Sequence, residues 1–186
     1  MKYVITDITA TVCLYGYYEL DGTFVEPEGR GPQFYGMSYP ALAVGDGDYM
    51  GVVVRRIKAL RDIPEIGVKK GDLGGYIEDG SNLSQRGNCW VYDNAVVYNG
   101  GKVCGDAQVR DFAVIDGGTV DSNAVVSDKA YVLDTYVTVD ANIGGSATTY
   151  RGYVSSSMLT GDAFAASDYN QGRLEGRNIT TGVVRY

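Results

Sequence analysis

A branched aliphatic residue recurs about every six positions through the middle of the chain, among glycine, aspartate, asparagine and other polar residues. These positions are Val91, Val97, Val103, Val109, Ile115, Val120, Val126, Val132, Val137 and Ile143. A second slot, four residues after the first, holds mostly small residues. Its members are Ala95, Gly101, Ala107, Ala113, Thr119, Ala124, Ala130, Tyr136, Ala141 and Ala147. A period of six excludes an α-helix, and the hairpin turns of an antiparallel sandwich are absent. The pattern predicts an all-β parallel β-helix, in which each hexad forms one short strand and one corner.

Three hexads close one triangular turn of about 18 residues, so every third aliphatic should stack in one inward column. The predicted columns are Val91, Val109, Val126 and Ile143, then Val97, Ile115 and Val132, then Val103, Val120 and Val137. Two steps, Ile115–Val120 and Val132–Val137, are five residues long and shorten a corner without breaking the columns. We expect about five turns.

The β-helix is predicted to span residues 73–153, and the rest of the chain divides around it. Residues 1–52 are interpreted as an N-terminal strand followed by a small β-rich insertion, rich in tyrosine and glycine. Because a β-helix exposes unpaired strand edges at its ends, residues 53–72 are expected to connect to and cap the first turn. Residues 154–186 no longer follow the register and are expected to form a non-repeat C-terminal cap or assembly tail.

Charge and composition exclude several function classes. The net charge of −7 argues against a nucleic-acid partner. The basic residues Arg55, Arg56, Lys58 and Arg61 are better interpreted as solvated charge than as a binding face. The sequence contains no run of 18 apolar residues, so no membrane span is predicted. The three cysteines have no paired spacing and predict neither a zinc site nor a redox motif.

Candidate chemistry is sparse because the chain contains no histidine. Without it, no Ser-His or Cys-His nucleophile pair can form, and we expect no catalytic residues and no cofactor. A carboxylate pair for glycoside hydrolysis stays open as an alternative. Asp93, Asp111 and Asp128 should stack along one edge, where a cation could bridge them. A solvated acidic edge is the favoured interpretation, so no metal site is predicted.

Aromatic residues supply the candidate partner-binding positions. Those of the insertion are Tyr15, Tyr17, Tyr18, Phe34, Tyr35 and Tyr39, which could equally form a small core of their own. Trp90 is expected to project outward over the connecting segment that contains Ile57, Leu60 and Ile63. The alternative for Trp90 is a platform on which a sugar stacks.

The motif NLSQRGNCWVYDNA, Asn82 to Ala95, opens the repeats. Together with the hexads it resembles the hexapeptide-repeat, left-handed parallel β-helix proteins, and residues 55–97 resemble a phage and prophage-encoded branch of uncharacterised or polymer-forming proteins. The resemblance implies a left-handed helix and a homotrimer. Many hexapeptide-repeat proteins are acyltransferases that use a histidine base, which this chain lacks, so an enzyme is not expected.

These observations favour a non-enzymatic phage structural protein: a virion decoration, fibre or spike component with the β-helix as a rigid stalk. It would be assembled in the bacterial host cytoplasm with capsid or tail proteins as partners. One alternative is an intracellular phage or prophage protein that inhibits a host or defence complex. Another is a spike that binds or cleaves polysaccharide.

Overall fold

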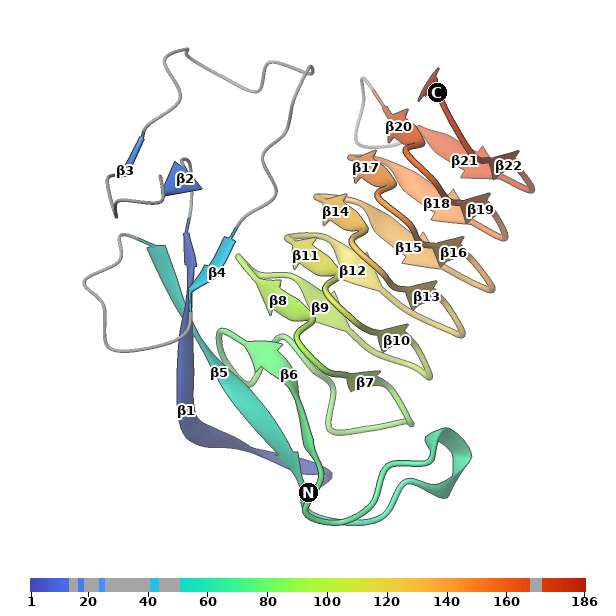
Figure 1. Ribbon diagram of the computed structural model, residues 1–186. Helices are drawn as coiled ribbons and strands as arrows, with labels where there is room; N and C mark the ends of the chain where they lie inside the picture. Colours follow the sequence, from blue (N-terminus) through green and yellow to red (C-terminus); the bar gives the residue numbers. More distant parts are fainter. Residues whose placement is uncertain (14–16, 19–23, 26–40, 44–50, 168–171) are drawn as a thin grey trace.

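The computed structural model describes residues 1–13, 17–18, 24–25, 41–43, 51–167 and 172–186. The chain winds into a parallel β-helix of the left-handed type with about six turns (Figure 1). Among the described residues, the single helical element is a 3-10 turn, η1 (Pro64–Ile66), and no helix is long and apolar enough to cross a membrane. The prediction of an all-β parallel β-helix is confirmed.

Three sheets of short parallel strands make the faces of the prism. The first face holds β6 (Leu73–Ile77), β8 (Val96–Tyr98), β11 (Val114–Asp116), β14 (Tyr131–Leu133), β17 (Thr148–Tyr150), β20 (Phe164–Ala166) and β23 (Val183–Arg185). The second face holds β7 (Trp90–Val91), β10 (Gln108–Val109), β13 (Val125–Val126), β16 (Asn142–Ile143), β19 (Met158–Leu159) and β22 (Asn178–Ile179). The third face holds β9 (Lys102–Val103), β12 (Thr119–Val120), β15 (Tyr136–Thr138), β18 (Tyr153–Ser155) and β21 (Arg173–Glu175).

The N-terminal strands extend the first face in antiparallel fashion. Strand β5 (Gly51–Ala59) pairs with β6, β1 (Tyr3–Cys13) pairs with β5, and β4 (Ala41–Ala43) pairs with the end of β1. Strands β2 (Tyr17–Tyr18) and β3 (Phe24–Val25) pair only with each other among the described elements. The first face therefore contains two kinds of strand, parallel turns and an antiparallel hairpin.

The inward columns follow the predicted register. Val91, Val109, Val126 and Ile143 are neighbours in the second face, and each is fully buried. The columns of the first and third faces are paired in the same way, through Ile115 and Val120 respectively. One β-branched side chain per strand suits this position, because it fills the prism axis and meets its equivalents above and below.

The expected non-repeat tail after residue 153 is wrong, because parallel turns continue to Arg185. Val154 pairs with Leu174, and Leu159 pairs with Ile179. The repeat is hard to see there because the step from Ala165 to Leu174 is nine residues long, against the usual five or six. This longer step hides the six-residue period. Because the strands continue to Arg185, the β-helix has about six turns rather than five.

The small inward slot was misassigned at the two shortened corners. Thr119 and Tyr136 were predicted to point inward, but both lie half-buried on the outside of the third face, in register with Lys102. The small slot is instead filled by the residue before each, Gly118 and Thr135, which lie against each other in successive turns. Thr135 is 0% exposed and Gly118 is half-buried. Removing one residue from the corner moves the small slot back by one position.

Thr149 offers a test of the packing in the first-face column. It lies between Val132 and Ala165, is fully buried, and its hydroxyl has no hydrogen-bond partner. Thr149→Val removes an unsatisfied polar group while keeping the branched shape, so we expect the free energy of unfolding to rise by about 1–2 kcal/mol. Urea unfolding measures this, with Thr148→Val on the outer side of the same strand as the control. A loss of stability in Thr149→Val would show that the hydroxyl is in fact satisfied.

Residues 53–72 pack against the first turn. Ile57, Ile63 and Val68 are buried in the same apolar core as the inward columns. Leu60 is exposed to 38%, so it does not share this packing. The segment thus supplies an apolar lid where the first turn would otherwise present its interior to water.

Candidate functional site

The outer side of the first face carries a second apolar cluster, separate from the core inside the prism. Strands β1 and β5 bend over the early turns and pack their inner residues against them (Figure 1). The buried members are Ala10, Val12 and Val54 from the hairpin and Tyr76, Val96, Tyr98, Val114 and Tyr131 from the prism. The N-terminal hairpin is therefore held against a side of the β-helix as well as against its end.

A buried carboxylate lies within this cluster. Asp116 is 8% exposed, and its Oδ2 accepts hydrogen bonds from the hydroxyls of Tyr98 at 2.7 Å and Tyr131 at 2.6 Å. Its Oδ1 accepts a third from Asn99 Nδ2 at 2.8 Å. Burial, followed by the neighbouring Tyr131 and Asp116, raises the pKa of Tyr98 well above its usual range. Because Tyr98 is then held protonated as a donor, the group suits fixing the face and does not suit proton transfer.

Arg56 ties the hairpin to the first corner of the β-helix. Its Nη2 donates to the carbonyl of Asp93 at 2.8 Å and to Asn94 Oδ1 at 2.9 Å, and its guanidinium lies 4.8 Å from the centre of the Tyr76 ring. One member of the basic cluster thus has a structural role, while Arg55 is exposed.

The hairpin carries the insertion from two adjacent points. Cys13 at the end of β1 is paired with Gly51 at the start of β5, so residues 14–50 leave and rejoin the same antiparallel ladder. The candidate residues Tyr15, Phe34, Tyr35 and Tyr39 lie outside the described residues. Of Tyr17 and Tyr18, the structure describes only the backbone of β2.

Trp90 is buried and does not form a surface platform. It is 1% exposed, and the ring of Tyr3 packs edge-on against it with centroids 6.4 Å apart. It shares the core cluster with Ile57 and Ile63, which matches the expected covering of that segment. The expected outward projection is therefore wrong, and neither a sugar nor a protein partner can reach the ring in this structure. Tyr3, 87 positions earlier in the chain, provides the cover that sequence reasoning missed.

The three stacked aspartates act as corner acceptors. Asp93, Asp111 and Asp128 each have a positive φ. The carboxylate of Asp111 accepts the backbone N–H of Asp128 at 3.0 Å, and that of Asp128 accepts the N–H of Gly145 at 2.8 Å. Among the described residues, no group of three acidic or cysteine side chains is placed to hold a metal ion. The stacking is as predicted, but these contacts explain it without a cation.

This column predicts a graded response to substitution at Asp128. Asp128→Ala removes the hydrogen-bond acceptor and places alanine, which adopts the left-handed conformation less readily than aspartate, in the corner. We therefore expect the free energy of unfolding to fall by about 1–2 kcal/mol. Asp128→Gly keeps the backbone conformation and should cost less, while Asp128→Asn keeps both features and should stay within about 0.5 kcal/mol of the parent. Thermal or urea unfolding measures the order. An alanine variant as stable as the asparagine variant would contradict it.

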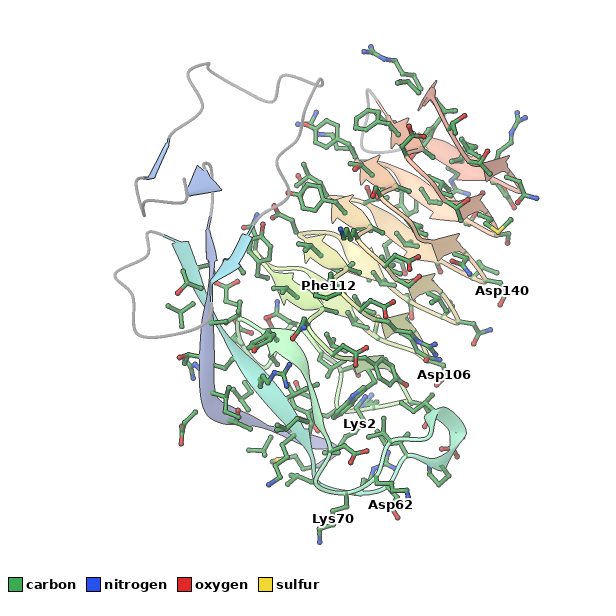
Figure 2. All side chains as sticks on the ribbon, viewed as in Figure 1. Lys2, Asp62, Lys70, Asp106, Phe112 and Asp140 are labelled. Carbon is green, nitrogen blue, oxygen red and sulfur yellow. The ribbon has the colours of Figure 1, made fainter. Side chains whose placement is uncertain are left out.

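Lys2 is a buried cation that sequence reasoning missed. It is 1% exposed, and Figure 2 shows it at the end of the prism where the turns begin. Its Nζ donates to the carbonyl of Cys89 at 2.8 Å and to that of Arg86 at 3.4 Å, and lies 3.1 Å from Cys89 Sγ. Nothing in the local sequence signals this, because the acceptors come from a loop more than 80 residues away. Lys2 therefore donates hydrogen bonds to two backbone carbonyls of the first turn.

Neither of the described free thiols is activated. Burial is the largest cause that raises the pKa of Cys89, and the nearby Lys2 only partly opposes it. Burial and a hydrogen bond to Asp121 raise the pKa of Cys104 to about 11. A thiol that stays protonated at neutral pH is a weak nucleophile, so these cysteines suit packing rather than catalysis.

Comparison with known proteins adds one partial likeness. No protein-family model matches the chain. Over 88 residues it is 32% identical to a protein named "Uncharacterized acetyltransferase YdcK" from Escherichia coli (strain K12). The match covers 47% of this chain but only 26% of that protein, so it spans about a quarter of the relative's length. The chain is thus a parallel β-helix with a stretch similar to part of YdcK.

Proposed function

We propose that the protein is a non-enzymatic structural component of a phage particle, a decoration, fibre or spike protein in which the β-helix is a rigid support. The observation that carries the proposal is the fixed hairpin. Cys13 and Gly51 are paired, and the hairpin they belong to is held to the first face by the second apolar cluster. The prism therefore fixes Cys13 and Gly51, the two points between which residues 14–50 are inserted.

Two further features favour a structural role over a catalytic one. The chain has no histidine, and the buried polar groups Lys2 and Asp116 are already saturated with internal hydrogen bonds. A general acid or base must reach the substrate, and both groups are buried and hydrogen-bonded within the protein. The motif from Asn82 to Ala95 resembles a phage-encoded branch of β-helix proteins, which supports the proposal that the chain is part of a phage particle.

Mass spectrometry of purified particles tests the proposal, and we expect the chain at stoichiometric copy number. A variant in which residues 14–50 are replaced by Asn-Gly should still fold, because Cys13 and Gly51 are already in hairpin register. It should be lost from particles or should abolish their attachment, while Gly100→Ala at an exposed corner should not. Absence of the parent chain from particles, with abundance in infected cells, would favour the intracellular interaction protein instead.

The likeness to YdcK, which is named an uncharacterized acetyltransferase, favours a second candidate, acetyl transfer. Calorimetric titration of the full chain with acetyl-coenzyme A tests it directly. We expect no saturable binding, because the chain has no histidine to act as the base that the transfer requires. Binding with a dissociation constant in the micromolar range would favour the enzyme and overturn the proposed role.

A further inference from the structure

The third face presents a pair of neighbouring aromatic rings, tilted to each other, outside the prism. Tyr136 and Tyr153 are the first residues of neighbouring strands, both are half-buried, and their ring centroids lie 5.2 Å apart. The guanidinium of Arg173 lies 5.4 Å from the centre of the Tyr153 ring, and the hydroxyl of Tyr136 donates to Asp121 Oδ2 at 3.1 Å. The rings are therefore ordered in advance, which lowers the entropic cost of binding against them.

Charge is arranged in two parallel columns on this face. The column of the tyrosines begins at Lys102 and ends at Arg173, both exposed. The column two residues further along each strand contains Asp121 and Glu175. The face thus carries cations along one edge and anions along the other, with tyrosines between the charged ends.

We propose that the third face binds the same face of a second copy of this chain, with the two prism axes parallel, which gives a two-fold dimer in place of the homotrimer that the resemblance implies. A two-fold axis parallel to the prisms brings the tyrosine column of one copy opposite the acidic column of the other. Arg173 then faces the partner's Glu175, and the contact occurs twice. An antiparallel arrangement would instead oppose Lys102 to the partner's Arg173, and like charges across an interface are repulsive.

The other faces fit a second copy less well. Early turns of the first face are covered by the hairpin of the same chain. On the second face, Arg110 is directed onto Gln108 and over the Tyr92 ring. In the acidic column beside it, Asp111 and Asp128 already accept backbone N–H groups of the next turn. The third face combines aromatic area with self-complementary charge, and aromatic residues and arginine are enriched where proteins associate.

Sedimentation velocity of the full chain tests this self-association independently of any particle. We expect a species larger than the 20.0 kDa monomer at tens of micromolar. Arg173→Glu and Glu175→Arg should each weaken association at least tenfold. The double variant should restore it, because the swapped charges face each other again. Lys129→Glu, at an exposed corner away from this face, is the matched control.

A second measurement uses the unaltered protein. Mixing ¹⁴N- and ¹⁵N-labelled chains and adding a carbodiimide, which couples an amine directly to a carboxylate, should join Lys102 of one copy to the partner's Asp121, giving peptides of mixed isotope. A monomeric parent chain, a double variant that stays dissociated, or cross-links within single chains only would overturn the proposal. Dissociation by Lys129→Glu as strong as that by Arg173→Glu would overturn it too.

Discussion

Replacing Gly118 by alanine is expected to lower the free energy of unfolding by about 3–5 kcal/mol, among the largest effects of any single methyl group in this chain. Gly118 has a φ of +70° and fills the small slot at a shortened corner. A Cβ there would lie 2.6 Å from the backbone nitrogen of Thr135 and closer still to its carbonyl oxygen. Because both contacts are with the backbone of the next turn, no side chain can rotate away.

Gly100 provides the matched control. Its φ is +74°, but a Cβ on it would meet no atom within 4 Å. Gly100→Ala therefore isolates the cost of the left-handed conformation, about 1–2 kcal/mol. Urea unfolding of both variants separates the two terms. Equal losses in the two variants would mean that the turns at this corner can move apart, and that the stacking is looser than the structure indicates.

The six-residue repeat was predictable because every turn places residues in the same buried positions, with the same space to fill. A position buried from every side and repeated along an axis accepts a narrow choice of residue, so Val109 or Ile115 reveals its environment by its type alone. The shortened corners show where that reasoning stops. Counting four residues on from Ile115 reached Thr119, whereas the chain needs its small residue one position earlier, at Gly118.

The hairpin and the end of the prism were beyond local patterns. Lys2 and Tyr3 are identified as interior residues only by partners that lie more than 75 residues away, including Cys89 and Leu83. Trp90 looked like a surface aromatic for the same reason, since its cover is Tyr3. The stacking of Asp111 and Asp128 could be predicted from spacing, but their role as acceptors for backbone N–H groups depends on positive φ angles that the spacing does not reveal.

Alkaline pH should destabilise the fold through two buried tyrosines. Burial is the main cause that raises the pKa of Tyr3 to about 12, and burial beside Tyr131 and Asp116 raises that of Tyr98 further. A folded-state pKa above the unfolded value of about 10 gives stability that is complete below pH 10 and is lost as the pH rises through the folded value. Above about pH 10 the unfolded chain binds fewer protons than the folded one. Each such tyrosine therefore lowers the free energy of unfolding by about 1.4 kcal/mol per pH unit.

Tyr3→Phe tests the sign and the size of this effect. At pH 8 the variant should be less stable by about 1–2 kcal/mol, because Tyr3 loses its hydrogen bonds to the carbonyls of Leu83 and Gly80. Its stability should then fall less steeply above pH 10, since one tyrosine that stays protonated in the folded state is gone. Urea unfolding between pH 8 and 12 should show the free energies of unfolding of the parent chain and of Tyr3→Phe converging as the pH rises. Absorbance of tyrosinate should show that the variant has one tyrosine fewer among those that ionise only when the chain unfolds. Parallel curves would mean that the hydroxyl of Tyr3 ionises as readily in the folded protein as in the unfolded chain, and that the end of the prism is open to water.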